Sequence, residues 1–138
     1  RKLTKVEIPN NSKLEIIGSN AFVHSGIEKI FIPPKISKIC EYAFSRCENL
    51  TKVVIPENSN LQTIECGAFA CSHVKSVYIA SKVSKICDYA FYYCQNLQIV
   101  GISDDSKLES FKLQTFLGNP NIVIMIPSSL KKLINRYE

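Results

Sequence analysis

Long apolar runs, catalytic motifs and histidines are scarce in this chain of 138 residues. No apolar run approaches the roughly 20 residues of a membrane-spanning helix. No apolar segment follows the basic N-terminus, RKLTKVEIP, as a secretion signal would require. The patterns GxSxG and HExxH and the phosphate-binding loop are absent, and acidic residues are scattered singly apart from Asp104-Asp105 in a turn. Because no acid, base and nucleophile converge, we expect no enzyme, no catalytic residues, no cofactor and no metal.

Low-complexity composition is lacking as well. Five glycines, six prolines, 46% apolar and 21% charged residues are typical of a soluble globular protein. The net charge of +5 is mildly basic, without the dense lysine and arginine runs of a nucleic-acid-binding tail. We expect one folded domain over residues 1–138, with no nucleic-acid partner and no membrane insertion.

What the chain has instead is internal repetition. The dipeptide Ala-Phe begins at positions 21, 43, 68 and 90, and Thr115-Phe116 is a fifth, degenerate copy. The intervals alternate between 22 and 25 residues, so the full period is 47 residues, and residues 3–49 align with residues 50–96 without a gap. Each period divides into two similar turns. The turns begin near residues 3, 27, 50, 74, 97 and 121.

Each turn opens with a short strand pattern. The stretches LTKVEIP, LTKVVIP and VKSVYIA alternate apolar residues with others, which predicts a half-buried β-strand. A second apolar pair follows in each of the first five turns, from Leu14 and Ile17 in the first to Leu108 and Phe111 in the fifth. The polar stretch around each Ala-Phe is too brief for a long helix, and we expect one helical or 3₁₀ turn there.

Stacked turns of this kind predict a solenoid. One turn cannot bury its own apolar face, but parallel strands of successive turns pair about 4.8 Å apart and build continuous apolar columns. The phenylalanines would form an aromatic column opposite the sheet: Phe22, Phe44, Phe69, Phe91 and Phe116. The predicted fold class is an α/β solenoid of about six turns, with a parallel β-sheet on its concave face and short helical or 3₁₀ turns on its convex face.

These motifs resemble the BspA-like leucine-rich repeats, also called the treponemal type. The stretches LTKVEIPNNSKLEIIGSNAF and CEYAFSRCENLTKVVIP match the consensus of that family closely, and the match covers essentially the whole chain. The C-terminal IVIMIPSSLKKLINRYE is similar to the last strand and terminal helical cap of such proteins, with the cap over residues 128–138. The strand at residues 3–9 would be an open edge, which is either covered by preceding sequence or liable to pair with another copy.

The resemblance also implies a role. The family is found on the surfaces of host-associated bacteria and of anaerobic protozoan parasites, and the alternating turn lengths favour the protozoan members. Members are implicated in adhesion, so the resemblance implies a non-enzymatic, cell-surface or secreted module that binds a host or extracellular matrix protein. The alternative is an intracellular leucine-rich repeat scaffold or regulator, which reduced cysteines would suit.

Six cysteines fall into two sets. Cys47, Cys71 and Cys94 precede the next strand by three residues, the place where leucine-rich repeats carry an inward Asn or Cys. His24 and Gly118 hold that place in two other turns. The second set comprises Cys40 and Cys87, which replace the glycine of Ile17-Gly18, and Cys66, which lies one residue further along its turn.

The spacing of the cysteines bears on their chemistry. The pairs enclose six, four and six residues, unlike the short paired motifs of zinc sites, and the redox motif CxxC is absent. We interpret all six as buried structural thiols, with a disulfide as the next alternative and a metal site as the least favoured. Cys40 and Cys87 are two turns apart, roughly 9–10 Å, which is beyond disulfide reach, whereas inward cysteines on adjacent turns are within reach by distance.

The outward strand positions carry the candidate binding surface. They are basic at one end and apolar along a stripe across the other strands, and contiguous exposed apolar residues often mark protein contacts. The predicted partner-binding residues are Lys5, Lys29, Phe31, Lys52, Val54, Tyr78, Ile99 and Met125. Two other interpretations stay open: β-propensity alone selects such residues on strand surfaces, or another part of a longer chain covers the stripe.

Overall fold

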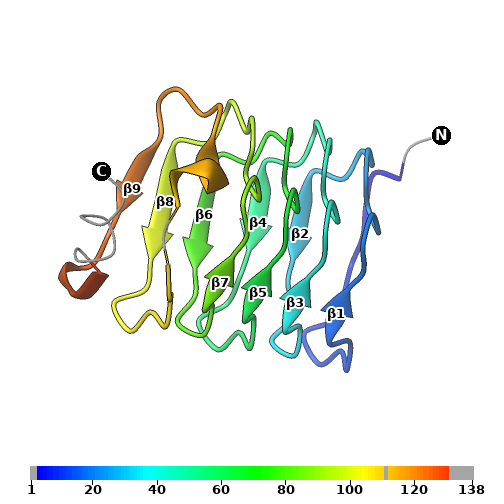
Figure 1. Cartoon of the computed structure of the whole chain (residues 1–138). Coiled ribbons are helices and arrows are strands. Elements are labelled where there is room, and N and C mark those ends of the chain that lie inside the picture. The colour runs from blue at the N-terminus through cyan, green and yellow to red at the C-terminus, as the bar shows by residue number, and fades with distance from the viewer. Residues whose placement is uncertain (1–2, 111, 131–138) are drawn as a thin grey trace.

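The computed structural model describes residues 3–110 and 112–130, which wind into a parallel β-solenoid (Figure 1). The strands of the described residues form two parallel sheets, and the chain alternates between them as far as β8. The larger sheet contains β2 (Lys29–Phe31), β4 (Lys52–Val54), β6 (Ser76–Ile79), β8 (Ile99–Ile102) and β9 (Val123–Met125). The smaller sheet contains β1 (Ile16–Ile17), β3 (Lys38–Ile39), β5 (Thr63–Ile64) and β7 (Lys85–Ile86). The predicted leucine-rich repeat solenoid with a parallel sheet is confirmed.

The larger sheet follows the predicted strand pattern. Its strands pair in register, for example Ile30 with Val53 and Val77 with Val100. These four side chains are buried while their sequence neighbours on both sides face outward or are half-buried, because successive side chains of a strand alternate between its faces. The inward residues therefore form the expected apolar columns.

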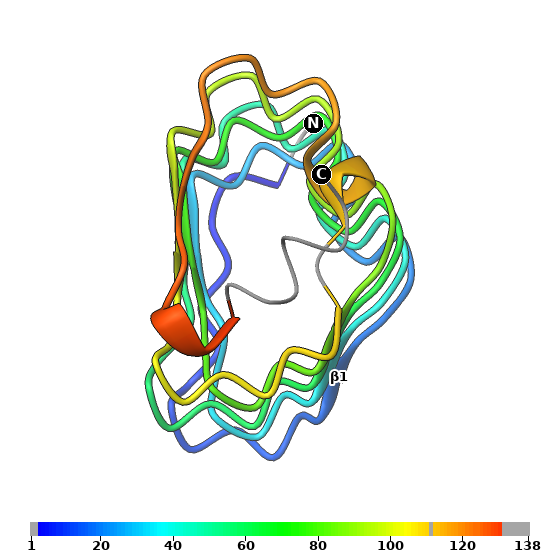
Figure 2. The same cartoon turned by 60° about the vertical axis from the view of Figure 1, so that its left-hand side comes forward.

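The smaller sheet was not predicted as strands. Four buried isoleucines pair in series across adjacent turns: Ile17 with Ile39, Ile39 with Ile64, and Ile64 with Ile86. Strands of two residues are too short to display the alternation by which a strand is recognised in sequence. Figure 2, a view more nearly along the solenoid, shows β1 on the opposite side of the coil from the orange strand β9. Phe111, which we expected at the corresponding position in the fifth turn, lies outside the described residues.

The Ala-Phe segments are successive β-turns instead of the expected helical turns. In the second copy, the N–H of Ala43 donates to the carbonyl of Cys40 and that of Ser45 to the carbonyl of Tyr42. Tyr42 and Arg46 adopt φ values of 58°, and such left-handed residues interrupt a right-handed helix. Of the four Ala-Phe copies and the degenerate fifth, all of which lie in the described residues, only the fifth forms a 3₁₀ helix, η1 (Leu113–Phe116).

The aromatic column is present as predicted. The rings of successive phenylalanines stack with centroid distances of 5.3, 5.1, 5.2 and 5.6 Å along the series Phe22, Phe44, Phe69, Phe91 and Phe116. The N–H groups of the first four phenylalanines of this column also donate to the following turn, each to the carbonyl of the residue that precedes the next phenylalanine of the column, at 2.7–2.9 Å. Backbone hydrogen bonds thus join adjacent turns on this side as well as in the two sheets.

The inward polar column differs from the prediction by one residue in alternate turns. Cys47 and Cys94 belong to it, but Cys71, His24 and Gly118 do not: they occupy the left-handed position before it, at φ values of 59°, 58° and 88°. The column runs Ser25, Cys47, Ser72, Cys94 and Asn119. The reason is that the connection from this column to the next strand is one residue shorter after Ser25 and Ser72 than after the two cysteines.

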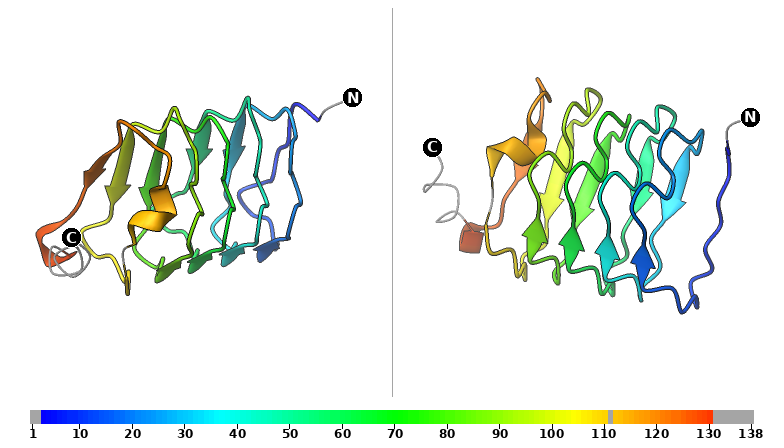
Figure 3. Two further views of the ribbon diagram at one scale, coloured as in Figure 1. Left: turned by 45° about the horizontal axis from the view of Figure 1, so that its top comes forward. Right: turned by 45° about the vertical axis from the view of Figure 1, so that its right-hand side comes forward.

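The first strand of the prediction, at residues 3–9, does not pair. Within the described chain, a hydrogen bond of 2.6 Å from Gly26 N–H to the Leu3 carbonyl connects this segment to the turn before β2, and residues 4–9 make no backbone hydrogen bond to β2. The segment runs beside the larger sheet without forming an arrow (Figure 3). Val6 and Ile8 are only half-buried against the core, so less apolar contact holds this segment than holds an internal strand.

The predicted C-terminal cap lies mostly outside the described residues, which end at residue 130. Its first three residues form the 3₁₀ helix η2 (Ser128–Leu130), and Leu130 is buried against the core. The predicted cap residues 131–138 are not described.

Candidate functional site

Pairing in the larger sheet builds the candidate surface from two outward columns. One column contains Lys29, Lys52, Ser76, Ile99 and Val123, which are paired in that order. The second contains Phe31 paired with Val54, and Tyr78 paired with Gly101, which pairs in turn with Met125. Because parallel strands stack in register, residues one turn apart in sequence become near neighbours on one face.

Seven of the eight predicted partner-binding residues lie on this face, in β2, β4, β6, β8 and β9. The exception is Lys5, which lies in the unpaired segment before β1 and forms an ion pair of 3.1 Å with Glu7. Both side chains are more than three-quarters exposed, and such surface pairs contribute little to stability. The structure therefore does not extend the basic column to Lys5.

The character of the face changes along the solenoid. Lys29 and Lys52 stand side by side on β2 and β4, with Phe31 and Val54 half-buried beside them. Towards β9 the exposed side chains are apolar: Tyr78, Ile99, Val123 and Met125 are 38%, 46%, 59% and 62% exposed. Charge therefore lies at one end of the face and exposed apolar area at the other.

A shallow hollow of about 410 Å³ opens at the apolar end. It is lined by Tyr78, Gly101, Asp104, Met125 and Pro127, together with Ile102 and Ile126. The hollow exists because Gly101 has no side chain between its paired neighbours Tyr78 and Met125. We did not predict Gly101 as part of the site, although a glycine inside a strand pattern often marks a close approach by another group.

A second hollow, of about 580 Å³, lies at the basic end. Val6, Glu7, Ile8 and Pro9 form one side, and Lys29, Ile30, Phe31, Lys52 and Val54 form the other. It results from the failure of the first segment to pair with β2. Lysine residues, one glutamate and apolar residues thus line the same depression.

A separate aromatic cluster lies near the Ala-Phe turns. Tyr89, Tyr92 and Tyr93 are 46%, 37% and 49% exposed. The rings of Tyr89 and Tyr92 meet edge to face at 5.7 Å, and those of Tyr92 and Tyr93 are 5.6 Å apart. All three rings therefore lie outside the buried core.

The cysteines differ in burial. Cys47 and Cys94 are completely buried, as predicted, whereas Cys40, Cys66, Cys71 and Cys87 are half-buried, which corrects the prediction for those four. Burial raises the pKa of Cys94 to about 11 and also raises the pKa of Cys47. The thiols of Cys47 and Cys94 donate to the carbonyls of Phe22 and Phe69, at 3.0 Å in both cases. These two thiols are therefore protonated parts of the core.

Among residues 3–110 and 112–130, no group of three or more His, Cys, Asp and Glu side chains is arranged to hold a metal ion. In the same residues, no helix has the length and apolar character to cross a membrane.

Comparison with known proteins identifies the repeat type. The model of the BspA type leucine rich repeat region matches residues 1–98, in six copies. No curated protein sequence matches the chain.

Solved structures show the same fold. The pneumococcal vaccine antigen PcpA superposes with a TM-score of 0.69 at 17% identity, over 93% of this chain and 37% of its own. The leucine rich repeat protein of T. pallidum, TpLRR, gives 0.58 at 20% identity, over 83% and 64%. A leucine rich cell surface protein from Faecalibacterium prausnitzii gives 0.53 at 21% identity, over 80% and 35%. The chain thus spans less than two thirds of each.

Proposed function

The chain belongs to the BspA-type leucine-rich repeat family, and we propose that it is a non-enzymatic adhesion module of a cell-surface or secreted protein. Repeats of this family and fold are typically protein-interaction modules. The proposed partner is a host or extracellular matrix protein, bound on the outward face of the larger sheet. The observation that carries the proposal is the exposed apolar area of Tyr78, Ile99, Val123 and Met125 around the hollow at Gly101.

The two ends of this face would make different contributions to binding. At the apolar end, burial of exposed side chains supplies free energy, and an aromatic ring beside a hollow resembles the anchors that dominate protein interfaces. At the basic end, Lys29 and Lys52 would attract an acidic partner and raise the association rate more than the affinity. Phe31 and Val54 connect the two ends as half-buried residues in the same sheet.

The test is binding of the purified chain to a panel of extracellular matrix proteins and to host epithelial cells. Y78S combined with M125S should weaken the strongest interaction at least tenfold. Y92S is the matched control, since Tyr92 is 37% exposed against 38% for Tyr78 but lies in the separate tyrosine cluster. Equal binding by the wild type and the double variant, with both folded, would reject this face as the adhesion surface.

A second experiment separates the basic end. K29Q combined with K52Q should slow association and reduce its dependence on salt, because fewer charges attract the partner. K35Q combined with K107Q removes two exposed lysines that lie outside the strands of the face and should leave both quantities unchanged.

The second candidate function is an intracellular scaffold, and one observation favours it. All six cysteines are free thiols, and four of them are half-buried, which is more common in reducing compartments. Locating the native protein by surface labelling of intact cells distinguishes the two candidates: labelling supports the adhesion module, and protection supports the scaffold.

A further inference from the structure

Cys66 and Cys87 lie on adjacent turns, just beyond the smaller sheet. β5 and β7 pair Ile64 with Ile86, and the N–H of Cys87 donates to the carbonyl of Ile64 at 2.9 Å. Cys87 is one residue beyond its paired isoleucine and Cys66 is two beyond. Strand spacing of about 4.8 Å and a rise of about 3.3 Å per residue place the two Cα atoms roughly 6 Å apart. That separation lies within the range in which disulfides form.

The two side chains also interact. Burial is the largest influence that raises the pKa of Cys87, followed by the charge of the Cys66 thiolate and by a side-chain hydrogen bond between the two cysteines. Neither cysteine belongs to the inward column, so neither thiol is occupied in the hydrogen bonds that hold Cys47 and Cys94. The proximity of the backbones and the interaction of the side chains thus agree.

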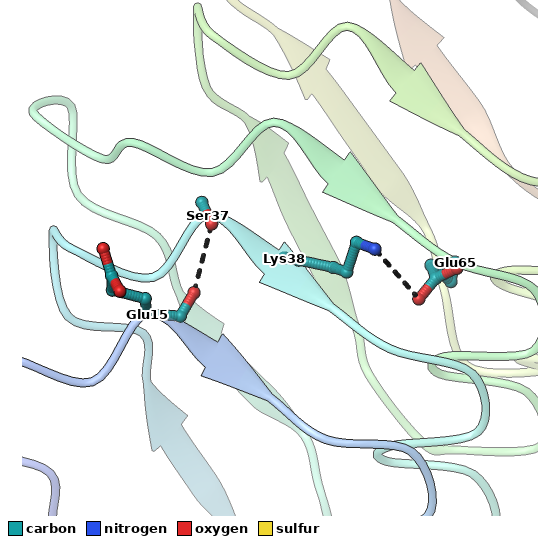
Figure 4. A network of polar contacts seen from close by, with 4 residues as sticks. All are labelled: Glu15, Ser37, Lys38 and Glu65. Atoms are coloured by element: carbon teal, nitrogen blue, oxygen red, sulfur yellow. Dashed lines mark hydrogen bonds and ion pairs between the residues drawn. The ribbon is translucent and has the colours of Figure 1, made fainter.

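Cys40 occupies the same position as Cys87 two turns earlier, but its surroundings differ. Its pKa is raised first by burial and then by a hydrogen bond to Glu65. Glu65 also lies 3.9 Å from the ammonium of Lys38, in a polar group that includes the Ser37 hydroxyl donating to the Glu15 carbonyl (Figure 4). Cys40 therefore makes its side-chain hydrogen bond with a carboxylate, whereas Cys87 makes its own with a thiol.

Reagents can reach this pair. Cys66 and Cys87 are half-buried, whereas Cys47 and Cys94 are completely buried. A small reagent can approach the first pair without unfolding of the chain, and disulfide exchange requires such access.

We propose that Cys66 and Cys87 are a redox-sensitive pair that forms an intramolecular disulfide when the chain meets a small disulfide such as oxidised glutathione. One cysteine thiolate attacks a glutathione sulfur, so that a mixed disulfide forms and one glutathione leaves as its thiolate. The second cysteine thiolate then attacks the protein sulfur of that mixed disulfide and releases the second glutathione. Two protein thiols lose two electrons and two protons, and oxidised glutathione gains them as two reduced molecules.

The disulfide would join two adjacent turns covalently. It would lie beside the smaller sheet, whereas the candidate binding residues project from the larger sheet. The disulfide constrains the unfolded chain and so raises the stability of the solenoid, without occupying the candidate surface. The inference goes beyond the proposed function and does not depend on it.

The test is peptide mapping of the full chain after oxidation. The reduced protein is incubated with oxidised glutathione, free thiols are alkylated at low pH, and the chain is digested without reduction by trypsin and chymotrypsin. Cleavage after Phe69 separates Cys66 from Cys71, and cleavage after Tyr89 or Phe91 separates Cys87 from Cys94. We expect a Cys66–Cys87 linked peptide, loss of two of six thiols, a melting temperature raised by several degrees, and full reversal by dithiothreitol.

Variants make the result specific. C66S and C87S should each abolish the linked peptide and the thermal shift, whereas C40S, a half-buried cysteine at the position equivalent to Cys87, should retain both. A Cys40–Cys66 linked peptide, or glutathione attached stably to both cysteines without a link, would overturn the proposal. Because the wild-type map is read directly, poor folding of one variant leaves the test intact.

Discussion

The thiol of Cys94 donates a hydrogen bond of 3.0 Å to the carbonyl oxygen of Phe69 on the preceding turn. Cys47 makes the same contact with Phe22, and Asn119 donates to Phe91 at 3.0 Å. A carbonyl that faces the core needs a partner inside the protein, because water does not reach it. The cysteines of this column therefore act as small, buried hydrogen-bond donors.

Cys94→Ala should destabilise the chain by about 1–3 kcal/mol, because it removes a donor to Phe69 and leaves the buried Ser72 hydroxyl without the sulfur 3.6 Å away. Cys94→Ser keeps a donor and should cost less, since Ser72 occupies the equivalent place one turn earlier. Urea unfolding of the two variants and the wild type measures the difference. Equal losses for both variants would show that sulfur volume matters more than the hydrogen bond.

Thiol labelling of the native chain should separate the cysteines into two groups. Maleimide at neutral pH should modify Cys40, Cys66, Cys71 and Cys87, whereas Cys47 and Cys94 should react only after denaturation, because burial blocks access and raises their pKa. Mass spectrometry of alkylated peptides gives the extent at each site. Rapid native labelling of Cys94 would contradict its place in the core.

The pH dependence of stability should carry a signature of Cys94. Its pKa rises from 9.0 to about 11 on folding, so the thiol ionises more easily in the unfolded chain. The stabilising effect is complete below pH 9 and disappears as pH rises from 9 to 11, with a total of at most about 3 kcal/mol. Unfolding free energies of the wild type and of Cys94→Ser, measured from pH 7 to 11, should converge towards high pH if this is correct.

The repeat period predicted stacking well because identical residues at 47-residue intervals must occupy identical positions in a solenoid. Phe44 and Phe91 stack in the same column for that reason. The period did not reveal that the connection from the inward column to the next strand is one residue shorter in alternate turns. Cys71 was therefore placed in the inward column, at the position that Ser72 occupies. Counting back from the strand failed because the connection after Ser72 is shorter than that after Cys94.

The candidate surface was predictable only in part. Alternation along each strand placed Phe31, Tyr78 and Met125 outward, and the larger sheet has them on that face. To predict the hollow at Gly101, one must know which residues flank this glycine in the neighbouring strands and how their side chains surround it. The sequence pattern alone does not give that arrangement. Whether residues 3–9 pair with β2 depends on how much apolar area they bury. The alternation of apolar residues in their sequence does not measure that area.

Gly67→Ala should destabilise the chain by more than the roughly 1–2 kcal/mol expected for a left-handed alanine. Gly67 has a φ of +66°, and a Cβ there would lie 2.5 Å from Cδ1 of Tyr42. Adding Tyr42→Ala to Gly67→Ala should recover the part of the loss that is due to the ring. Gly18→Ala is the control, since no atom lies within 4 Å of its added Cβ, and thermal unfolding of these three variants and of Tyr42→Ala alone measures these effects. Strict additivity of the two substitutions would exclude the steric contact.

Phe69→Ala should cost about 3–5 kcal/mol, because it leaves a cavity in the middle of the aromatic column. The ring of Phe69 is completely buried and stacks at 5.1 Å on Phe44 and at 5.2 Å on Phe91. Phe22→Ala should cost distinctly less, since Phe22 is half-buried and stacks on Phe44 alone among the described phenylalanines, at 5.3 Å. Chemical unfolding monitored by circular dichroism compares the two. If both substitutions cost the same, the column would stabilise each turn separately, and contact between neighbouring turns would not be what holds this solenoid together.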